Sequence, residues 1–191
     1  MRLCTWSHFF TLAYTKRKLI GLRLDYMENF NVLFASILSQ REPDAVAWVK
    51  GNEKYPNLSG QLGFYRTLRN AILISVEIFG LPDEENITGF YGMHIHEYGN
   101  CKDAFEKTGV HYNPENVPHP EHAGDMPSLL SNHGYAWMAF FDQRLTIEEI
   151  IDRSVVIHKQ RDDFTTQPSG DSGEKIGCGV IMPFKRVPYR K

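Results

Sequence analysis

Hydrophobic positions in the chain after Pro43 fall into short, partly alternating runs. Clusters of turn-forming residues, such as Gly51-Asn52 and Pro56-Asn57, separate these runs. The runs cover residues 45–50, 60–66, 71–79, 92–97, 135–141, 154–158 and 179–182. Runs of this length and alternation are typical of half-buried β-strands. The pattern therefore predicts an all-β domain of seven or eight strands, arranged as a sandwich or flattened barrel.

The segment before Pro43 has a helical period. Residues 27–41 carry apolar side chains at helical spacing, namely Phe30, Leu33, Phe34, Ile37 and Leu38. This spacing predicts a short amphipathic helix that either packs on the domain or presents a docking stripe to a partner. Residues 146–152 also have a local preference for helix, but their position directly before the run at 154–158 favours a loop that leads into a strand.

Residues 1–26 match neither pattern. Polar residues interrupt their apolar part, and the basic cluster Lys16-Arg17-Lys18 follows it, whereas a secretory signal has its charges first. No stretch of the chain approaches the roughly 18 apolar residues of a membrane span. We interpret residues 1–26 as a disordered or non-native extension before a start at Met27, residues 27–44 as helix and linker, and residues 45–191 as the β-domain. A cytoplasmic protein is expected, with export as the alternative.

The composition sets only broad limits. The chain has 191 residues, of which 42% are hydrophobic, enough to form the core of one domain. Its formal net charge of −2 gives no reason to expect nucleic acid or a membrane surface as a partner.

Histidines provide the chemistry. Six of the eight lie between residues 94 and 158, and an aspartate accompanies them: His94, His96, His111, His119, His122, His158 and Asp125. Imidazole is a common ligand of zinc and copper, and one carboxylate among histidines suits zinc. His94 and His96 alternate, so a strand would project both from one face. The segment 109–125 is rich in Gly, Pro and Asn and therefore predicts a loop. Together they predict a two-metal site.

The segments that carry these residues resemble the copper,zinc superoxide dismutase family. They are similar to its first copper-ligand strand, the two ends of its zinc loop, its last copper ligand and its C-terminal strand. In order, the segments are Gly92-Met-His-Ile-His-Glu-Tyr-Gly99, Gly109-Val-His-Tyr-Asn-Pro114, His122-Ala-Gly-Asp-Met126, Ser154-Val-Val-Ile-His158 and Gly173-Glu-Lys-Ile-Gly-Cys-Gly-Val-Ile181. The resemblance covers roughly residues 45–183 and implies a Greek-key barrel of about eight antiparallel strands with long metal-binding loops.

The resemblance also implies a role for each residue. Copper would be held by His94, His96, His111 and His158, and zinc by His111, His119, His122 and Asp125. His111 would then bridge the two metals. Asp162, four residues after His158, would link a copper ligand to a zinc ligand. Reduced thiols are the default in an intracellular chain, but the family implies a disulfide between Cys101 and Cys178, worth about 4–5 kcal/mol in the chain-entropy model.

The implied activity is dismutation of superoxide to O2 and H2O2 by Cu(II)/Cu(I) cycling, with His111 delivering a proton. Lys175 is a departure, because the family usually has an arginine there to bind the superoxide anion, and lysine lacks the planar fork. A weaker anion guide is expected. The alternatives are a copper-buffering homologue with little turnover and a zinc-only structural module, although the intact copper-ligand set argues against the second. Superoxide is the expected partner, and a homodimer is possible.

Overall fold

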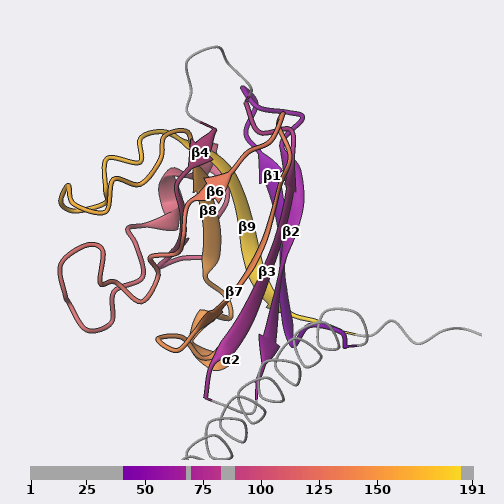
Figure 1. The fold of residues 1–191 in the computed structure, drawn as a ribbon, viewed down its shortest axis with the longest axis vertical. Helices are drawn as coiled ribbons and strands as arrows, with labels where there is room; N and C mark the ends of the chain where they lie inside the picture. Colours follow the sequence, from indigo (N-terminus) through magenta and orange to yellow (C-terminus); the bar gives the residue numbers. More distant parts are fainter. Residues whose placement is uncertain (1–40, 68–69, 83–88, 186–191) are drawn as a thin grey trace, which may run out of the picture. The chain divides into compact units, whose positions relative to one another are not determined.

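The computed structural model describes residues 41–67, 70–82 and 89–185 (Figure 1). The described residues from Glu42 onward form one compact unit. The extension predicted over residues 1–26 and the helix predicted before Pro43 fall on residues outside these ranges. Within the described ranges, no helix has the length and apolar character needed to cross a membrane.

Seven strands form one curled antiparallel sheet in the order β5-β8-β9-β1-β2-β3-β7 (Figure 1). A small second sheet pairs β4 with β6. The strands are β1 (Ala45–Gly51), β2 (Ser59–Arg66), β3 (Ile72–Phe79), β4 (Phe90–Tyr91), β5 (Met93–His96), β6 (Leu129–Leu130), β7 (Ala136–Asp142), β8 (Ser154–His158) and β9 (Lys175–Pro183). The predicted all-β antiparallel fold is confirmed, with the flattened barrel present as one curled sheet.

Two local predictions need correction. The last strand, predicted from residue 179, begins at Lys175. The loop predicted over residues 146–152 contains a helical turn, α2 (Ile147–Ile150). A capping box starts this turn, because the Glu149 amide donates to the Thr146 hydroxyl at 3.4 Å and the Thr146 amide donates to the Glu149 carboxylate at 3.1 Å. Thr146 and Glu149 therefore start a helical turn although the segment leads directly into β8.

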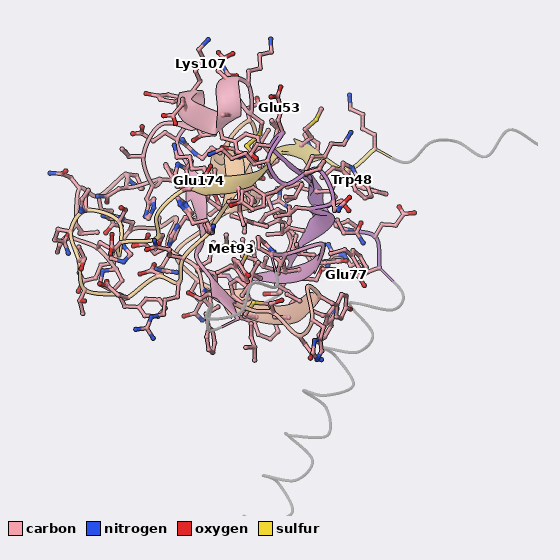
Figure 2. All side chains as sticks on the ribbon, turned by 90° about the horizontal axis from the view of Figure 1, so that it is seen from above. Trp48, Glu53, Glu77, Met93, Lys107 and Glu174 are labelled. Carbon is pink, nitrogen blue, oxygen red and sulfur yellow. A yellow bond between two sulfur atoms is a disulfide. The ribbon has the colours of Figure 1, made fainter. Side chains whose placement is uncertain are left out.

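Strand alternation separates the hydrophobic core from the histidines. On β5, Met93 and Ile95 join the core cluster on the inner face of the sheet, and Figure 2 labels Met93 inside the molecule. His94 and His96 consequently point to the outer face. β8 repeats this arrangement, since Val155 and Ile157 are core residues and Val156 lies directly opposite His94 on the outer face. The metal-ligand candidates therefore gather on the outer face, beneath the loops.

A disulfide ties the loop after β5 to the last strand. Cys101 and Cys178, 77 positions apart in the sequence, are bonded, with their Cα atoms 5.7 Å apart. Phe105, in the 3-10 helix η1 (Asp103–Thr108), packs with Val156 and Cys178 in a small cluster of its own. The predicted disulfide is confirmed, and together with this cluster it holds η1 against the outer face of the sheet.

Candidate metal centre

The structure brings the six histidines and Asp125 together beneath the loops. All seven side chains are buried, with at most 6% of the residue surface exposed. They form two groups whose candidate ligand atoms lie within 4.8 Å of one another, namely His94, His96, His111 and His158, and His111, His119, His122 and Asp125. His111 belongs to both groups, which we call the four-histidine group and the Asp125 group.

Backbone hydrogen bonds attach the loop of the Asp125 group to β5. The Ile95 amide donates to Gly124 O at 2.9 Å, the Tyr112 amide to Ile95 O at 2.8 Å, and the Gly124 amide to Tyr112 O at 2.8 Å. A side chain at position 124 would not fit, because its Cβ would lie 2.3 Å from Ile95 O. Gly124 thus allows a loop rich in Gly and Pro to approach the strand that carries His94 and His96.

His111 lies where the two groups meet. Its Nδ1 is 2.8 Å from Asp125 Oδ1, within the Asp125 group. Its ring stacks on that of His94, with the ring centres 3.8 Å apart. Its other nitrogen, Nε2, is buried without a hydrogen-bond partner. One ring thus offers a nitrogen to each group, as a bridging imidazolate requires.

Several buried nitrogens are arranged as metal ligands. His94 Nδ1, His119 Nδ1 and His122 Nδ1 also have no hydrogen-bond partner. His119 Nδ1 and His122 Nδ1 lie 2.9 and 3.2 Å from Asp125 Oδ2, yet neither is aligned to donate to it. Buried polar atoms without partners are rare in native proteins, and atoms that converge without bonding suit a common ion.

The two donor sets fit different metals. Four imidazole nitrogens suit a copper ion that alternates between oxidation states. Three imidazoles and one carboxylate suit a closed, four-coordinate zinc site. The two groups therefore match the copper and zinc sites expected from the family resemblance.

Outer hydrogen bonds fix the imidazole rings. The Asp162 carboxylate contacts one histidine from each group, with Oδ2 at 2.8 Å from His94 Nε2 and Oδ1 at 2.9 Å from His119 Nε2. His96 Nδ1 lies 2.9 Å from Gly109 O, and His158 Nδ1 lies 3.2 Å from Gly173 O. An imidazole N–H that donates to an oxygen leaves the other nitrogen free to bind a metal. Accordingly, the Nε2 atoms of His96 and His158 face each other at 3.2 Å.

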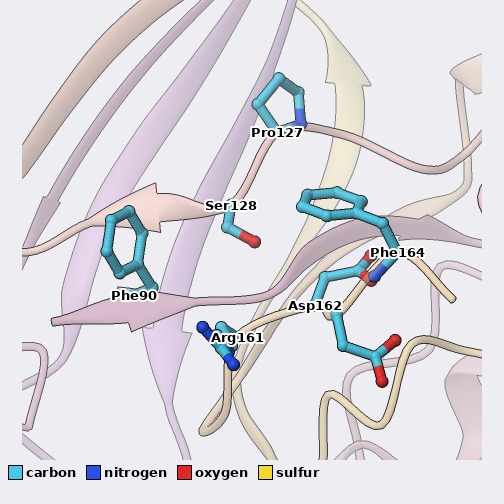
Figure 3. A pocket seen from close by; sticks show the side chains of 7 residues that line it. Phe90, Pro127, Ser128, Arg161, Asp162 and Phe164 are labelled. Carbon is cyan, nitrogen blue, oxygen red and sulfur yellow. The ribbon is translucent and has the colours of Figure 1, made fainter. Parts of the chain in front are cut away.

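Gly170 makes room for Asp162, a role that no local sequence pattern indicates. Gly170 has φ +67°, and a Cβ there would lie 1.9 Å from Asp162 Oδ1. Asp162 also lines a hollow of about 460 Å³ (Figure 3). Its lining is Phe90, Pro127, Ser128, Arg161, Asp162, Asp163 and Phe164. The absence of a side chain at Gly170 therefore lets the Asp162 carboxylate lie 2.9 Å from His119 Nε2.

Burial sets the protonation states. It lowers the pKa of His94 to about 4 and that of His158 to about 3, and it lowers the pKa of His96 still further. Burial alone would raise the pKa of Asp125, but the contact with His111 keeps it below its usual range. These histidines are therefore neutral and the carboxylate is charged at neutral pH, which are the forms that bind metals.

The Lys175 ammonium is held beside the four-histidine group. It donates to Thr108 Oγ1 at 2.9 Å, Gly109 O at 3.2 Å and Phe105 O at 3.4 Å. Gly109 O also contacts His96 Nδ1, so only one carbonyl separates the ammonium from a candidate ligand. Burial lowers the pKa of Lys175, while the charge of Glu106 acts in the opposite direction. An ammonium has three donors, and these three contacts account for all of them.

Comparison with known proteins gives a consistent result. The family model described as copper/zinc superoxide dismutase (SODC) matches residues 58–181. The extracellular Cu-Zn superoxide dismutase of Rattus norvegicus is 33% identical over 116 residues, which are 56% of this chain and 47% of the relative. The Cu-Zn superoxide dismutase 3 of Arabidopsis thaliana is 30% identical over 153 residues, which are 72% of this chain and 88% of the relative.

Two further similarities broaden the comparison. The copper chaperone for superoxide dismutase of Homo sapiens is 28% identical over 137 residues, 65% of this chain and 48% of the relative. A crystal structure of the clock protein EA4 superposes with a TM-score of 0.64 at 28% identity, covering 74% of this chain and 96% of that one. The chain spans about half the length of the extracellular mammalian relatives from rat, mouse and human.

Proposed function

Because the chain belongs to the copper/zinc superoxide dismutase family, we propose that it converts superoxide to O2 and H2O2. The observation that carries the proposal is the pair of buried groups that share His111. When bound, copper supplies one-electron redox chemistry, and zinc, which does not change its oxidation state, supplies a fixed positive charge. Two superoxide anions and two protons give one O2 and one H2O2.

Each group has a defined task in this proposal. His94, His96, His111 and His158 would hold copper, and His111, His119, His122 and Asp125 would hold zinc. His111 Nδ1 stays beside Asp125, so Nε2 is the nitrogen that can take and release a proton while the ring keeps its place. Asp162 orients His94 and His119 by accepting from their Nε2–H groups.

Lys175 is the residue proposed to guide the superoxide anion. Its ammonium places a positive charge one carbonyl away from His96. Because Thr108, Gly109 and Phe105 use its three donors, it acts through charge rather than through a hydrogen bond to the anion. An arginine would have five donors in a planar fork, so it could keep such contacts with the protein and also donate a hydrogen bond to the anion.

Substitutions at Lys175 test this role. Lys175→Arg is expected to keep or raise dismutation, and Lys175→Glu to lower it severely, because a carboxylate would repel both the anion and the carbonyls of Phe105 and Gly109. Activity of the parent should fall with ionic strength, since screening acts within about 8–10 Å near physiological salt. This dependence should shrink in Lys175→Ala. The measurement is superoxide consumption over a salt series, at matched copper and zinc content.

Lys107→Ala is the matched control. Lys107 lies on the exposed side of η1, where its side chain is 60% exposed and pairs with Asp103 (Figure 2). Removing this charge should leave both the rate and its salt dependence close to those of the parent. Equal rates and equal salt slopes in Lys175→Ala and the parent would contradict the guiding role.

A second candidate is a copper-binding homologue with little turnover. The engagement of all three Lys175 donors favours it, because no donor is left to bind the anion directly. The similarity to a copper chaperone for superoxide dismutase points the same way. A zinc-only module is a poorer account, since the four-histidine group offers four nitrogens of the kind that copper prefers.

A further inference from the structure

One arginine outside the metal loop contacts the backbone of two residues in the Asp125 group. Arg144 follows β7 and precedes α2. Its Nη1 donates to His122 O at 3.0 Å, and its Nη2 donates to Asp125 O at 2.5 Å. Nothing in the local sequence around Arg144 indicates this contact, because the residues it joins lie 22 and 19 positions away.

The two carbonyls belong to a turn that closes on itself. The His122 amide donates to Asp125 Oδ2 at 3.1 Å, and the Asp125 amide donates to His122 O at 3.1 Å. His122 Nδ1 and the Asp125 carboxylate both leave this turn toward the same point. The separation of the two side chains therefore depends on the geometry of the turn, and the guanidinium spans its two ends.

A buried carboxylate aims the guanidinium. Asp142, whose side chain is 4% exposed, accepts from Arg144 Nη2 at 2.7 Å and from the Arg144 backbone amide at 2.6 Å. The Arg144 side chain itself remains 42% exposed, so the hydrophobic core does not fix its position. Asp142 thus binds both the backbone amide and the guanidinium of Arg144, and the guanidinium is directed at the two carbonyls.

We propose that Arg144 is a positioning residue that presets His122 and Asp125 for zinc, with Asp142 orienting it. The inference rests on the proposed metal-binding function and extends it to a residue outside the loop. Asp162 orients His94 and His119 through their rings, whereas Arg144 acts on His122 and Asp125 through their backbone carbonyls. A lysine would keep the charge but lacks the fork needed to reach both carbonyls with fixed geometry.

The test compares Arg144→Lys and the double variant Arg144→Gln/Asp142→Asn with the full-length parent chain. The double variant avoids leaving a buried carboxylate without its partner. Zinc affinity is measured by competition with a chelator, and Co(II) bound at the zinc position reports ligand geometry through its visible absorption. We expect both variants to bind zinc about 10- to 100-fold more weakly, the usual effect of losing an outer partner. The Co(II) spectrum should change in both, because charge alone does not restore the turn.

Arg66→Gln is the control. Arg66 is also an arginine paired with carboxylates, those of Glu148 and Asp44, but these pairs lie at the surface and involve no member of the Asp125 group. This variant should keep the zinc affinity and the Co(II) spectrum of the parent. Zinc affinity like that of the parent in both Arg144 variants, or in Arg144→Lys only, would overturn the inference and leave the proposed function standing. Absence of zinc binding in the parent would overturn the proposed function and the inference with it.

Discussion

His111→Ala should lose both metals, whereas His158→Ala should lose copper and keep zinc. His111 belongs to both groups, with Nδ1 beside Asp125 and Nε2 unpaired, so its removal takes one of four donors from each. His158 belongs only to the four-histidine group, and its Nε2 faces His96 Nε2. We expect losses larger than the roughly 10- to 100-fold caused by removing an outer partner. Copper and zinc content after dialysis, measured by elemental analysis, gives the result.

His133→Ala controls for the loss of a histidine as such. His133 is in neither group, so this variant should bind both metals like the parent. If His111→Ala contains as much zinc as the parent, His111 is not a ligand shared by the two metals. Loss of zinc in His158→Ala would show instead that zinc binding by the Asp125 group depends on an intact four-histidine group.

Asp162→Asn should weaken zinc binding by about 10- to 100-fold and alter the copper environment as well. The Asp162 carboxylate accepts from His94 and His119, and contact with their rings keeps its pKa below the usual range although burial acts to raise it. An asparagine side chain has one oxygen, so one of the two imidazole N–H groups would face an amide N–H. The measurements are zinc affinity by chelator competition and the visible and paramagnetic resonance spectra of bound Cu(II).

Asp163→Asn is a matched control within the same loop. The Asp163 carboxylate accepts only local bonds, from Thr165 and Thr166, according to the contacts of the described chain. These bonds lower its pKa without involving any candidate ligand. Metal affinities in Asp163→Asn should match those of the parent. Equal effects of the two substitutions would show that Asp162 acts only through general charge.

Strand alternation made most of the fold predictable. The runs at 45–50, 60–66 and 71–79 correspond to β1, β2 and β3. Burial alternates with a period of two from Ala47 to Lys50 and from Ile74 to Phe79, whereas Leu62–Tyr65 of β2 are buried without alternation. β4 and β6 were not predicted, since two residues are too few to show a period. The start of β9 at Lys175 was also missed. It depends on pairing with His158 across a register shift, which the sequence does not show.

The candidate ligands could be found because each lies in a short motif with a known order along the chain. The residues that surround them are different. Arg144 reaches His122 and Asp125 from beyond β7, and Gly170 matters only because Asp162 passes beside it. The contacts of Lys175 with Phe105 and Thr108 likewise depend on where the disulfide places η1. Such long-range packing leaves no local pattern, so only the structure shows it.

The number of superoxide anions consumed per bound copper tests the central claim most directly. The full chain is loaded with copper and zinc, its metal content is measured, and superoxide is added in large excess over copper. The account predicts that the loaded chain consumes many superoxide anions per copper beyond the spontaneous dismutation measured with the metal-free chain, with O2 and H2O2 formed in equal amounts and this excess lost after chelation. An excess over spontaneous dismutation of no more than one superoxide anion per copper, with both metals bound, would contradict it and identify a copper-binding protein instead.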